Sequence, residues 1–141
     1  MLTVTPAEMA AAVRSLLDQG LTATIRPSGG SMRPFINPAT DEVVISRLPS
    51  YGIDCIVFAD VPGMGVMLHR VVAAEGDHFV LMGDANLQQR ERCSAADIIG
   101  AVTEIRRSGK AISTNDASFL RRSRLWRHLL PIRRLLLHIV H

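Results

Sequence analysis

Short stretches in which apolar and polar side chains alternate fill the middle of the chain, and residues typical of turns separate them. From residue 21 to residue 26, leucine, alanine and isoleucine alternate with threonine and arginine, which is the period of a half-buried strand. We expect further strands at 43–48, 53–59, 65–74, 78–82, 98–106 and 111–113. So many short strands predict a mostly β, compact and coiled core.

The beginning of the chain has helical periodicity instead. Thr5, Pro6 and Glu8 form a capping-box pattern with proline at the first helical position. Apolar residues then recur at helical spacing up to Gly20, where the helix should stop. The pattern predicts a short amphipathic N-terminal helix, because a membrane span needs about 20 apolar residues.

The end of the chain is both basic and apolar. The chain has 16 basic and 13 acidic residues, but residues 119–141 hold six of the arginines and no acidic residue. Leucine and isoleucine recur there at helical spacing, and Pro131 should kink the helix. This basic amphipathic segment has three competing interpretations: peripheral contact with an anionic membrane, docking of another protein, or packing on its own domain. Nucleic-acid binding is not expected, because no binding motif accompanies the arginines.

Composition bounds the class of protein. The chain has 141 residues, of which 48% are hydrophobic and 4% aromatic, as in one globular domain with an aliphatic core. Its two cysteines, Cys55 and Cys93, form no C-x-x-C pair and follow no secretory leader, so we expect no disulfide framework. The histidines are scattered, and we predict neither a metal ion nor another cofactor. Within the single domain we distinguish an N-terminal helix (1–20), a β core (21–114) and the basic tail (115–141).

The candidate chemistry begins with a serine that follows the first predicted strand. Gly29 and Gly30 precede Ser31, and glycine can adopt the positive φ of a sharp turn while leaving the backbone open to a substrate. The Ser31 hydroxyl is therefore a candidate nucleophile, the alternative being that it only caps a turn. A serine nucleophile needs a base, and imidazole suits that task near neutral pH.

His69 is the candidate base, and Asp84 the candidate acid behind it. His69 lies in an apolar β run, where an unpaired polar ring would be costly, so it needs a partner. Asp84 follows in a Gly-Asp turn and could orient and stabilise the ring.

Taken together, the motifs G-x-S-M-x-P, L-H-R-V-V and G-D-x-N, in this order, resemble those of the S24/S26 superfamily of serine peptidases, which holds signal peptidases and self-cleaving repressors. The resemblance covers roughly residues 21 to 105 and implies a coiled β core of the signal-peptidase and repressor-protease type. The matching residues are Gly29, Ser31, Met32, Pro34, His69, Arg70, Gly83, Asp84 and Asn86.

The resemblance implies Ser31 as nucleophile and His69 as base. The bacterial signal peptidases use lysine as base, whereas the endoplasmic-reticulum and sporulation branch has histidine. Lys110 is the single lysine of this chain and lies far from the motifs, so a Ser-Lys dyad is not expected. The histidine branch carries a further aspartate beyond the G-D motif, where this chain reads Gln88-Gln89-Arg90, and Asp84 is therefore favoured as the acid.

The oxyanion hole departs from the family pattern as well. The family commonly has a hydroxyl residue two positions before the nucleophile, where this chain has Gly29. Ser28 could substitute for it beside the Ser31 N–H. We expect Ser28, Gly29, Gly30 and Met32 to form the oxyanion and substrate-binding set.

The sequence thus predicts a serine endopeptidase that cleaves a peptide or precursor segment, after small apolar residues by analogy with the signal peptidases. We expect it in the cytoplasm, with peripheral contact to a membrane or a protein through residues 119–141. The alternative is a catalytically inactive peptide-binding module with the same fold, which the departures at the oxyanion and acid positions favour. A self-cleaving regulator is disfavoured, because no DNA-binding domain or Ala-Gly linker precedes the core.

Overall fold

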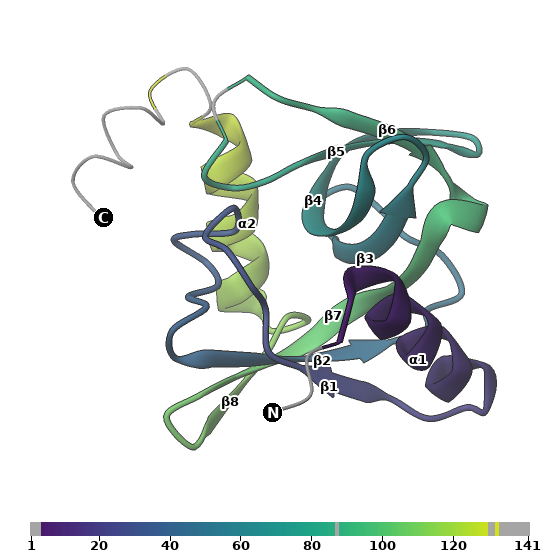
Figure 1. Ribbon diagram of the computed structural model, residues 1–141. Helices are drawn as coiled ribbons and strands as arrows, with labels where there is room; N and C mark the ends of the chain where they lie inside the picture. Colours follow the sequence, from purple (N-terminus) through teal and green to yellow (C-terminus); the bar gives the residue numbers. More distant parts are fainter. Residues whose placement is uncertain (1–3, 87, 130–131, 133–141) are drawn as a thin grey trace.

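The computed structural model describes residues 4–86, 88–129 and 132. The described part is mostly β, as predicted, with one helix near each end (Figure 1). In chain order the elements are α1 (Pro6–Asp18), β1 (Ala23–Ile25), β2 (Asp41–Ser46), β3 (Ile56–Val61), β4 (Gly65–Glu75), β5 (His78–Met82), β6 (Glu91–Ser94), a 3-10 turn (Ala95–Asp97), β7 (Ile98–Arg107), β8 (Lys110–Ser113) and α2 (Ala117–His128).

The strands form one curled antiparallel sheet in the order β1-β2-β7-β3-β4-β5-β6, with β8 paired to β7. Register shifts interrupt the pairing of β2 with β7, of β3 with β7 and of β4 with β5. Each such irregularity bends a strand and increases its twist, so the sheet curls into a half-barrel. The strand β6 was not predicted, because its charged and polar residues hide the alternation.

Two apolar clusters fill the two faces of this sheet. On β3, Ile56 and Phe58 belong to one cluster, and Val57 belongs to the other, because successive side chains of a strand point to opposite faces. The first cluster also takes in the buried face of α1 and Phe119 of α2. The second cluster is formed by residues of β3, β4, β5, β6 and β7.

The predicted N-terminal helix is confirmed as α1, including its capping box. The Thr5 side chain accepts a hydrogen bond from the Glu8 N–H at 3.1 Å, and the Glu8 carboxylate accepts one from the Thr5 N–H at 3.3 Å. These bonds satisfy backbone donors that would otherwise be unpaired at the helix start. Ala10, Val13 and Leu17 form the buried face.

The first part of the basic tail forms α2, which packs on the domain itself. Its buried residues are Phe119, Ser123 and Trp126. Leu125 and Ile132 belong to the leucines and isoleucines that recur at helical spacing in the tail, and they are instead 59% and 50% exposed. The stripe expected from helical spacing is therefore not the face that packs, because the bulkier aromatic rings take the core positions. The tail predictions for residues 130–131 and 133–141 lie outside the described residues.

Within the described ranges, neither α1 nor α2 is long and apolar enough to cross a bilayer.

Candidate active site

Ser31 lies in the turn that connects β1 to β2. Gly29 has φ 76°, the left-handed conformation that glycine adopts without strain, whereas Gly30 does not need a positive φ. The Arg33 N–H donates to the Gly30 carbonyl at 3.1 Å, and the Ile36 N–H donates to the Met32 carbonyl at 2.9 Å. These hydrogen bonds fix the backbone on both sides of the Ser31 hydroxyl.

The structure brings Ser31 and His69 together across 38 positions of sequence. His69 Nε2 lies 3.2 Å from Ser31 Oγ, which is within hydrogen-bond reach for a nucleophile and its base. The imidazole comes from β4, where His69 pairs with Val57 of β3, and the residue is only 7% exposed.

The carboxylate behind the imidazole is Glu91, at the start of β6. His69 Nδ1 lies 2.6 Å from Glu91 Oε1. Because a carboxylate can only accept, this contact favours the tautomer with the proton on Nδ1, in which the lone pair of Nε2 faces the Ser31 hydroxyl. The Glu91 side chain is fully buried, and its other oxygen, Oε2, has no hydrogen-bond partner among the described residues. The result is a chain of contacts from Ser31 through His69 to Glu91.

Asp84, which the sequence analysis placed behind His69, binds Arg70 instead. Arg70 Nε and Nη2 donate to Asp84 Oδ1 and Oδ2, each at 2.8 Å. Both side chains are buried, at 0% and 1% exposure. A buried guanidinium requires a counter-charge, so the Asp84 carboxylate is fully engaged in neutralising Arg70. Arg70 also donates from Nη1 to the Asp54 carbonyl at 2.8 Å.

Strand register explains why Glu91 contacts His69 whereas Asp84 contacts Arg70. Leu81 of β5 lies between Val71 of β4 and Glu91 of β6 in the pairing, so these side chains share one face of the sheet. His69 is two residues before Val71 and therefore points to the same face as Glu91. Arg70 points to the opposite face, where Asp84 meets it.

The turn after β5 packs against both Ser31 and His69. A Cβ on Gly83 would lie 2.7 Å from the Ser31 carbonyl oxygen and 3.2 Å from His69 Nε2, so only glycine fits there. The Ala85 N–H donates to the same Ser31 carbonyl at 2.9 Å, and the Asn86 N–H donates to the Gly83 carbonyl at 2.9 Å. The Gly-Asp-Ala-Asn turn therefore holds the backbone of the candidate nucleophile directly.

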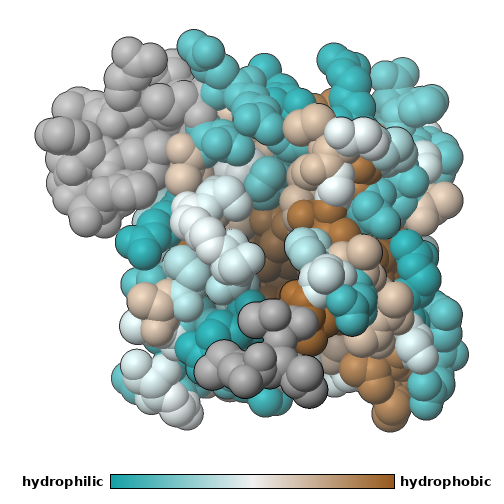
Figure 2. All heavy atoms as spheres, in the orientation of Figure 1, coloured by the Kyte–Doolittle hydropathy of each residue, from teal (hydrophilic) through white to brown (hydrophobic). Residues whose placement is uncertain are grey.

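An apolar groove of about 380 Å³ runs beside Ser31 and His69. Of the predicted oxyanion and substrate-binding residues, Ser28, Gly29 and Met32 line it, and Gly30 does not. Figure 2 shows one face of the molecule, on which hydrophilic residues border a hydrophobic hollow. The apolar side chains in the lining are Val4, Pro6, Met9, Ile25, Pro27, Met32, Ile36, Phe58, Val66, Met67 and Leu68.

The Ser31 N–H donates no hydrogen bond to another described residue. It therefore remains available as a hydrogen-bond donor beside the Ser31 hydroxyl.

The surroundings of the two cysteines disfavour the thiolate form of their side chains. Burial, helped by the nearby Asp97 charge, raises the pKa of the Cys93 thiol to about 11. Burial likewise raises the pKa of the Cys55 thiol. Since the thiolate is the reactive form, burial makes both cysteines poor nucleophiles near neutral pH. No group of three or more metal-ligating side chains occurs in the part of the chain that the structure describes.

Searches against protein-family models, curated proteins and solved structures find no match to this chain.

Proposed function

We propose that the protein is a serine endopeptidase in which Ser31 is the nucleophile, His69 the general base and Glu91 the acid that orients the imidazole. The observation that supports this most strongly is the continuous contact from Ser31 Oγ to His69 Nε2, at 3.2 Å, and from His69 Nδ1 to Glu91, at 2.6 Å. A nucleophile held by a base, with the base oriented by a third group, is the arrangement that acyl transfer requires.

In the first half of the reaction, Ser31 Oγ attacks the carbonyl carbon of the scissile peptide bond while His69 Nε2 takes the hydroxyl proton. The Glu91 carboxylate stabilises the imidazolium that forms. His69 then returns the proton to the leaving amine, the C–N bond breaks, and an acyl ester remains on Ser31. In the second half, His69 removes a proton from water, the hydroxide attacks the ester, and Ser31 leaves with that proton.

The oxyanion of each tetrahedral intermediate binds the Ser31 N–H, with the Ser28 hydroxyl as second donor. Both groups belong to the segment that borders the groove. Gly29 supplies no hydroxyl, so Ser28 is needed at this point of the mechanism.

The substrate that suits this site is a peptide or precursor segment with apolar residues before the scissile bond. The lining of the groove is predominantly apolar, and among the described residues that line it Arg26 alone carries a permanent charge. The motifs around Ser31, His69 and Asp84, with a mostly β core, support membership of the S24/S26 superfamily. Glu91 would then occupy the place of the acid of the histidine branch.

The site of action that we propose is the cytoplasm, with peripheral contact to a membrane through the basic tail. The arginines of residues 119–141 and the exposed apolar residues of α2, such as Leu125, support this contact.

Labelling with a fluorophosphonate, which reacts with activated serine hydroxyls, tests the proposed function. The wild-type chain should be labelled, and mass spectrometry should locate the adduct on Ser31. Ser31→Ala should abolish labelling, whereas Ser50→Ala, at an exposed serine, should leave it unchanged. Absence of labelling in the wild type, or labelling that survives Ser31→Ala, would overturn the proposal.

A peptide-binding module without catalysis is the second candidate function. Gly29, at the position where the family commonly has an oxyanion hydroxyl, is the observation that favours it. In that case apolar peptides should bind the groove, and the fluorophosphonate should not react with Ser31.

A further inference from the structure

Helix α2 contacts both segments that build the candidate active site. Its Trp126 donates from Nε1 to the Asp84 carbonyl at 3.1 Å. Trp126 is 7% exposed, and a buried indole N–H needs an acceptor. The acceptor belongs to the turn whose next residue, Ala85, donates to the Ser31 carbonyl. Helix α2 is therefore hydrogen-bonded directly to the turn that holds the Ser31 backbone.

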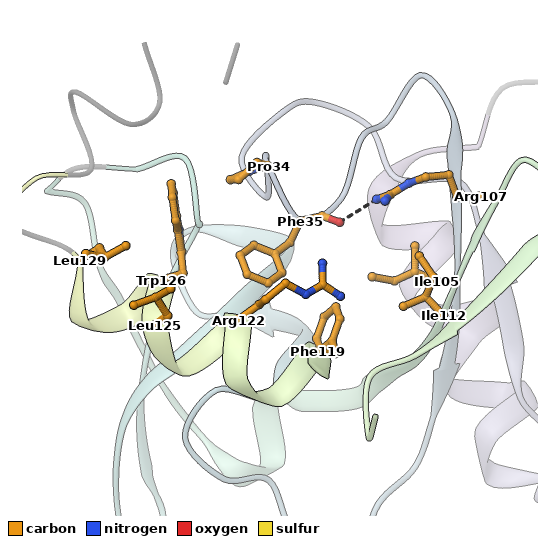
Figure 3. Close-up of a pocket in the computed structure, with 10 residues that line it drawn as sticks. All are labelled: Pro34, Phe35, Ile105, Arg107, Ile112, Phe119, Arg122, Leu125, Trp126 and Leu129. Atoms are coloured by element: carbon orange, nitrogen blue, oxygen red, sulfur yellow. Dashed lines mark hydrogen bonds between the residues drawn. The ribbon is translucent and has the colours of Figure 1, made fainter. Parts of the chain in front are cut away.

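The second contact reaches the turn after Ser31. The Phe35 ring meets the Phe119 and Trp126 rings edge to face, with centroid distances of 5.6 Å and 6.2 Å. Figure 3 shows the three rings facing one groove, with Phe35 coming from the loop and the other two from α2. The Arg70 guanidinium lies over the same Phe35 ring, 4.6 Å from its centroid. Ring pairs of this geometry resist displacement of the loop that carries them.

A third contact fixes the helix to the segment before β3. Arg127 Nε donates to the Asp54 carboxylate at 2.8 Å, and the Asp54 carbonyl accepts from Arg70. The end of α2 is thus tied to the guanidinium that binds Asp84. These contacts leave α2 little freedom to move independently of Arg70 and Asp84.

We propose that α2 is a positioning element of the active site and that Trp126 is its positioning residue. The indole N–H fixes the Asp84 carbonyl. The position of the whole turn is fixed with it, including Gly83 beside His69 and the Ala85 N–H that donates to the Ser31 carbonyl. Trp126 does not line the groove beside Ser31 and His69, so it is a positioning residue and not a catalytic one. A displacement of about 1 Å at a reacting group can cost a hundredfold in rate, so a hydrogen bond that fixes this turn affects reactivity. The expected change in labelling rate rests on the proposed function, whereas the positioning of the turn does not.

Trp126→Phe tests the proposal, because it removes the N–H donor and keeps an aromatic ring. The first readout needs no activity: hydrogen exchange of the Ala85 amide, which should become at least about tenfold faster once the turn loosens. The second readout is the kinetics of fluorophosphonate labelling of Ser31. The maximal rate of inactivation should fall about tenfold, with little change in the concentration for half-maximal rate. Ser118→Ala, at an exposed position of the same helix, is the control and should change neither readout.

A proton NMR signal separates positioning from general loosening. The Nδ1–H of His69, hydrogen-bonded to Glu91, should give a downfield resonance that Glu91→Gln shifts and that Trp126→Phe leaves in place. If Trp126→Phe does not fold, the single tryptophan can be replaced by β-benzothienylalanine, an isostere with sulfur in place of the N–H.

The outcomes distinguish the two proposals. Unchanged Ala85 exchange and unchanged labelling in the Trp126 variant would overturn the positioning role. Loss of the His69 signal together with slower labelling would overturn it as well, since the effect would then be general. Faster Ala85 exchange in a chain whose wild type is never labelled would support the positioning of the turn and refute the peptidase.

Discussion

The Glu91 carboxylate lies 2.6 Å from His69 Nδ1, in the position that the sequence motifs indicate for Asp84. Asp84 lies close by but has both oxygens on Arg70. One carboxylate thus contacts the candidate base, and the other neutralises a buried cation. Removing each charge should consequently produce a different defect.

Glu91→Gln should strongly slow the reaction of Ser31 while the protein stays folded. The amide can donate to Nδ1, which favours the tautomer with the proton on Nε2, and that tautomer cannot accept the Ser31 proton. We expect fluorophosphonate labelling of Ser31 to slow by roughly a thousandfold or more. The measurement is the labelling rate, with the thermal unfolding midpoint recorded beside it.

Asp84→Asn should mainly destabilise the fold. The substitution leaves the Arg70 guanidinium buried without a counter-charge, and breaking a buried pair in this way costs about 3–5 kcal/mol. Urea unfolding of the two variants gives the comparison. Should Asp84→Asn abolish labelling at wild-type stability while Glu91→Gln is labelled normally, the assignment of Glu91 would be wrong.

Gly83→Ala should disrupt the site by contact alone. The new methyl group would lie 2.7 Å from the Ser31 carbonyl oxygen, which is backbone and must move, and 3.2 Å from His69 Nε2. We expect labelling to fall at least about a hundredfold. Gly52→Ala is the matched control, because a methyl group there meets nothing within 4 Å. Equal labelling of the two variants would show that the Gly83 turn does not constrain Ser31.

Most strands could be predicted from the sequence, because the alternation of apolar and polar residues directly indicates a half-buried strand. The strand at 78–82 matches β5, and the capping box at Thr5 marks α1 within a few residues. The proximity of Ser31 to His69 followed from the family resemblance. Nothing in local periodicity could have supplied it, since the two residues meet through sheet pairing.

Glu91 escaped prediction because a buried carboxylate looks like a solvent-exposed residue in sequence. It alternates with Cys93 on one face of β6, while Arg92 points the other way. The sequence contained one sign that Asp84 does not bind His69, namely that His69 and Arg70 are adjacent. Adjacent side chains of a strand point to opposite faces, so Asp84 can contact only one of the two. Which one it serves depends on strand order, which local pattern does not reveal.

The basic tail should bind anionic membranes if the peripheral contact that we propose is correct. Arg121 and Arg124 are exposed on α2 near Leu120 and Leu125, which are 44% and 59% exposed. Co-sedimentation with phosphatidylglycerol vesicles should exceed that with phosphatidylcholine vesicles and should weaken with salt. The double change Arg121→Gln and Arg124→Gln should reduce affinity by about 2 kcal/mol, or roughly thirtyfold.

The control for membrane binding is Arg14→Gln, at an exposed position of α1, which should leave affinity unchanged. Equal sedimentation with both kinds of vesicle, or none with either, would refute the membrane contact and leave protein docking and packing on its own domain as the interpretations of the tail.

The Asp41–Arg107 pair should make stability depend on pH. Burial by itself raises the pKa of the Asp41 carboxyl, but it is outweighed by hydrogen bonds from Arg107, the Asn37 N–H and Thr40, and by the Arg107 charge, so the pKa lies below its usual 3.8. A carboxyl with a lowered pKa in the folded state stabilises the protein above its unfolded pKa. That contribution is complete above about pH 5 and is lost as the pH falls through the folded pKa.

Asp41→Asn should therefore lower the free energy of unfolding by about 2 kcal/mol at neutral pH, since it weakens several charged hydrogen bonds to a buried side chain. The difference from the wild type should shrink as the pH drops below 3.8, because the wild-type carboxyl then becomes protonated as well. Glu104→Gln breaks the exposed pair with Arg106 and should cost less than about 1 kcal/mol. Urea unfolding between pH 7 and pH 3 measures both variants. A difference for Asp41→Asn that stays constant across that range would mean that the charge of Asp41 does not stabilise the fold, and that only its shape and its hydrogen bonds matter.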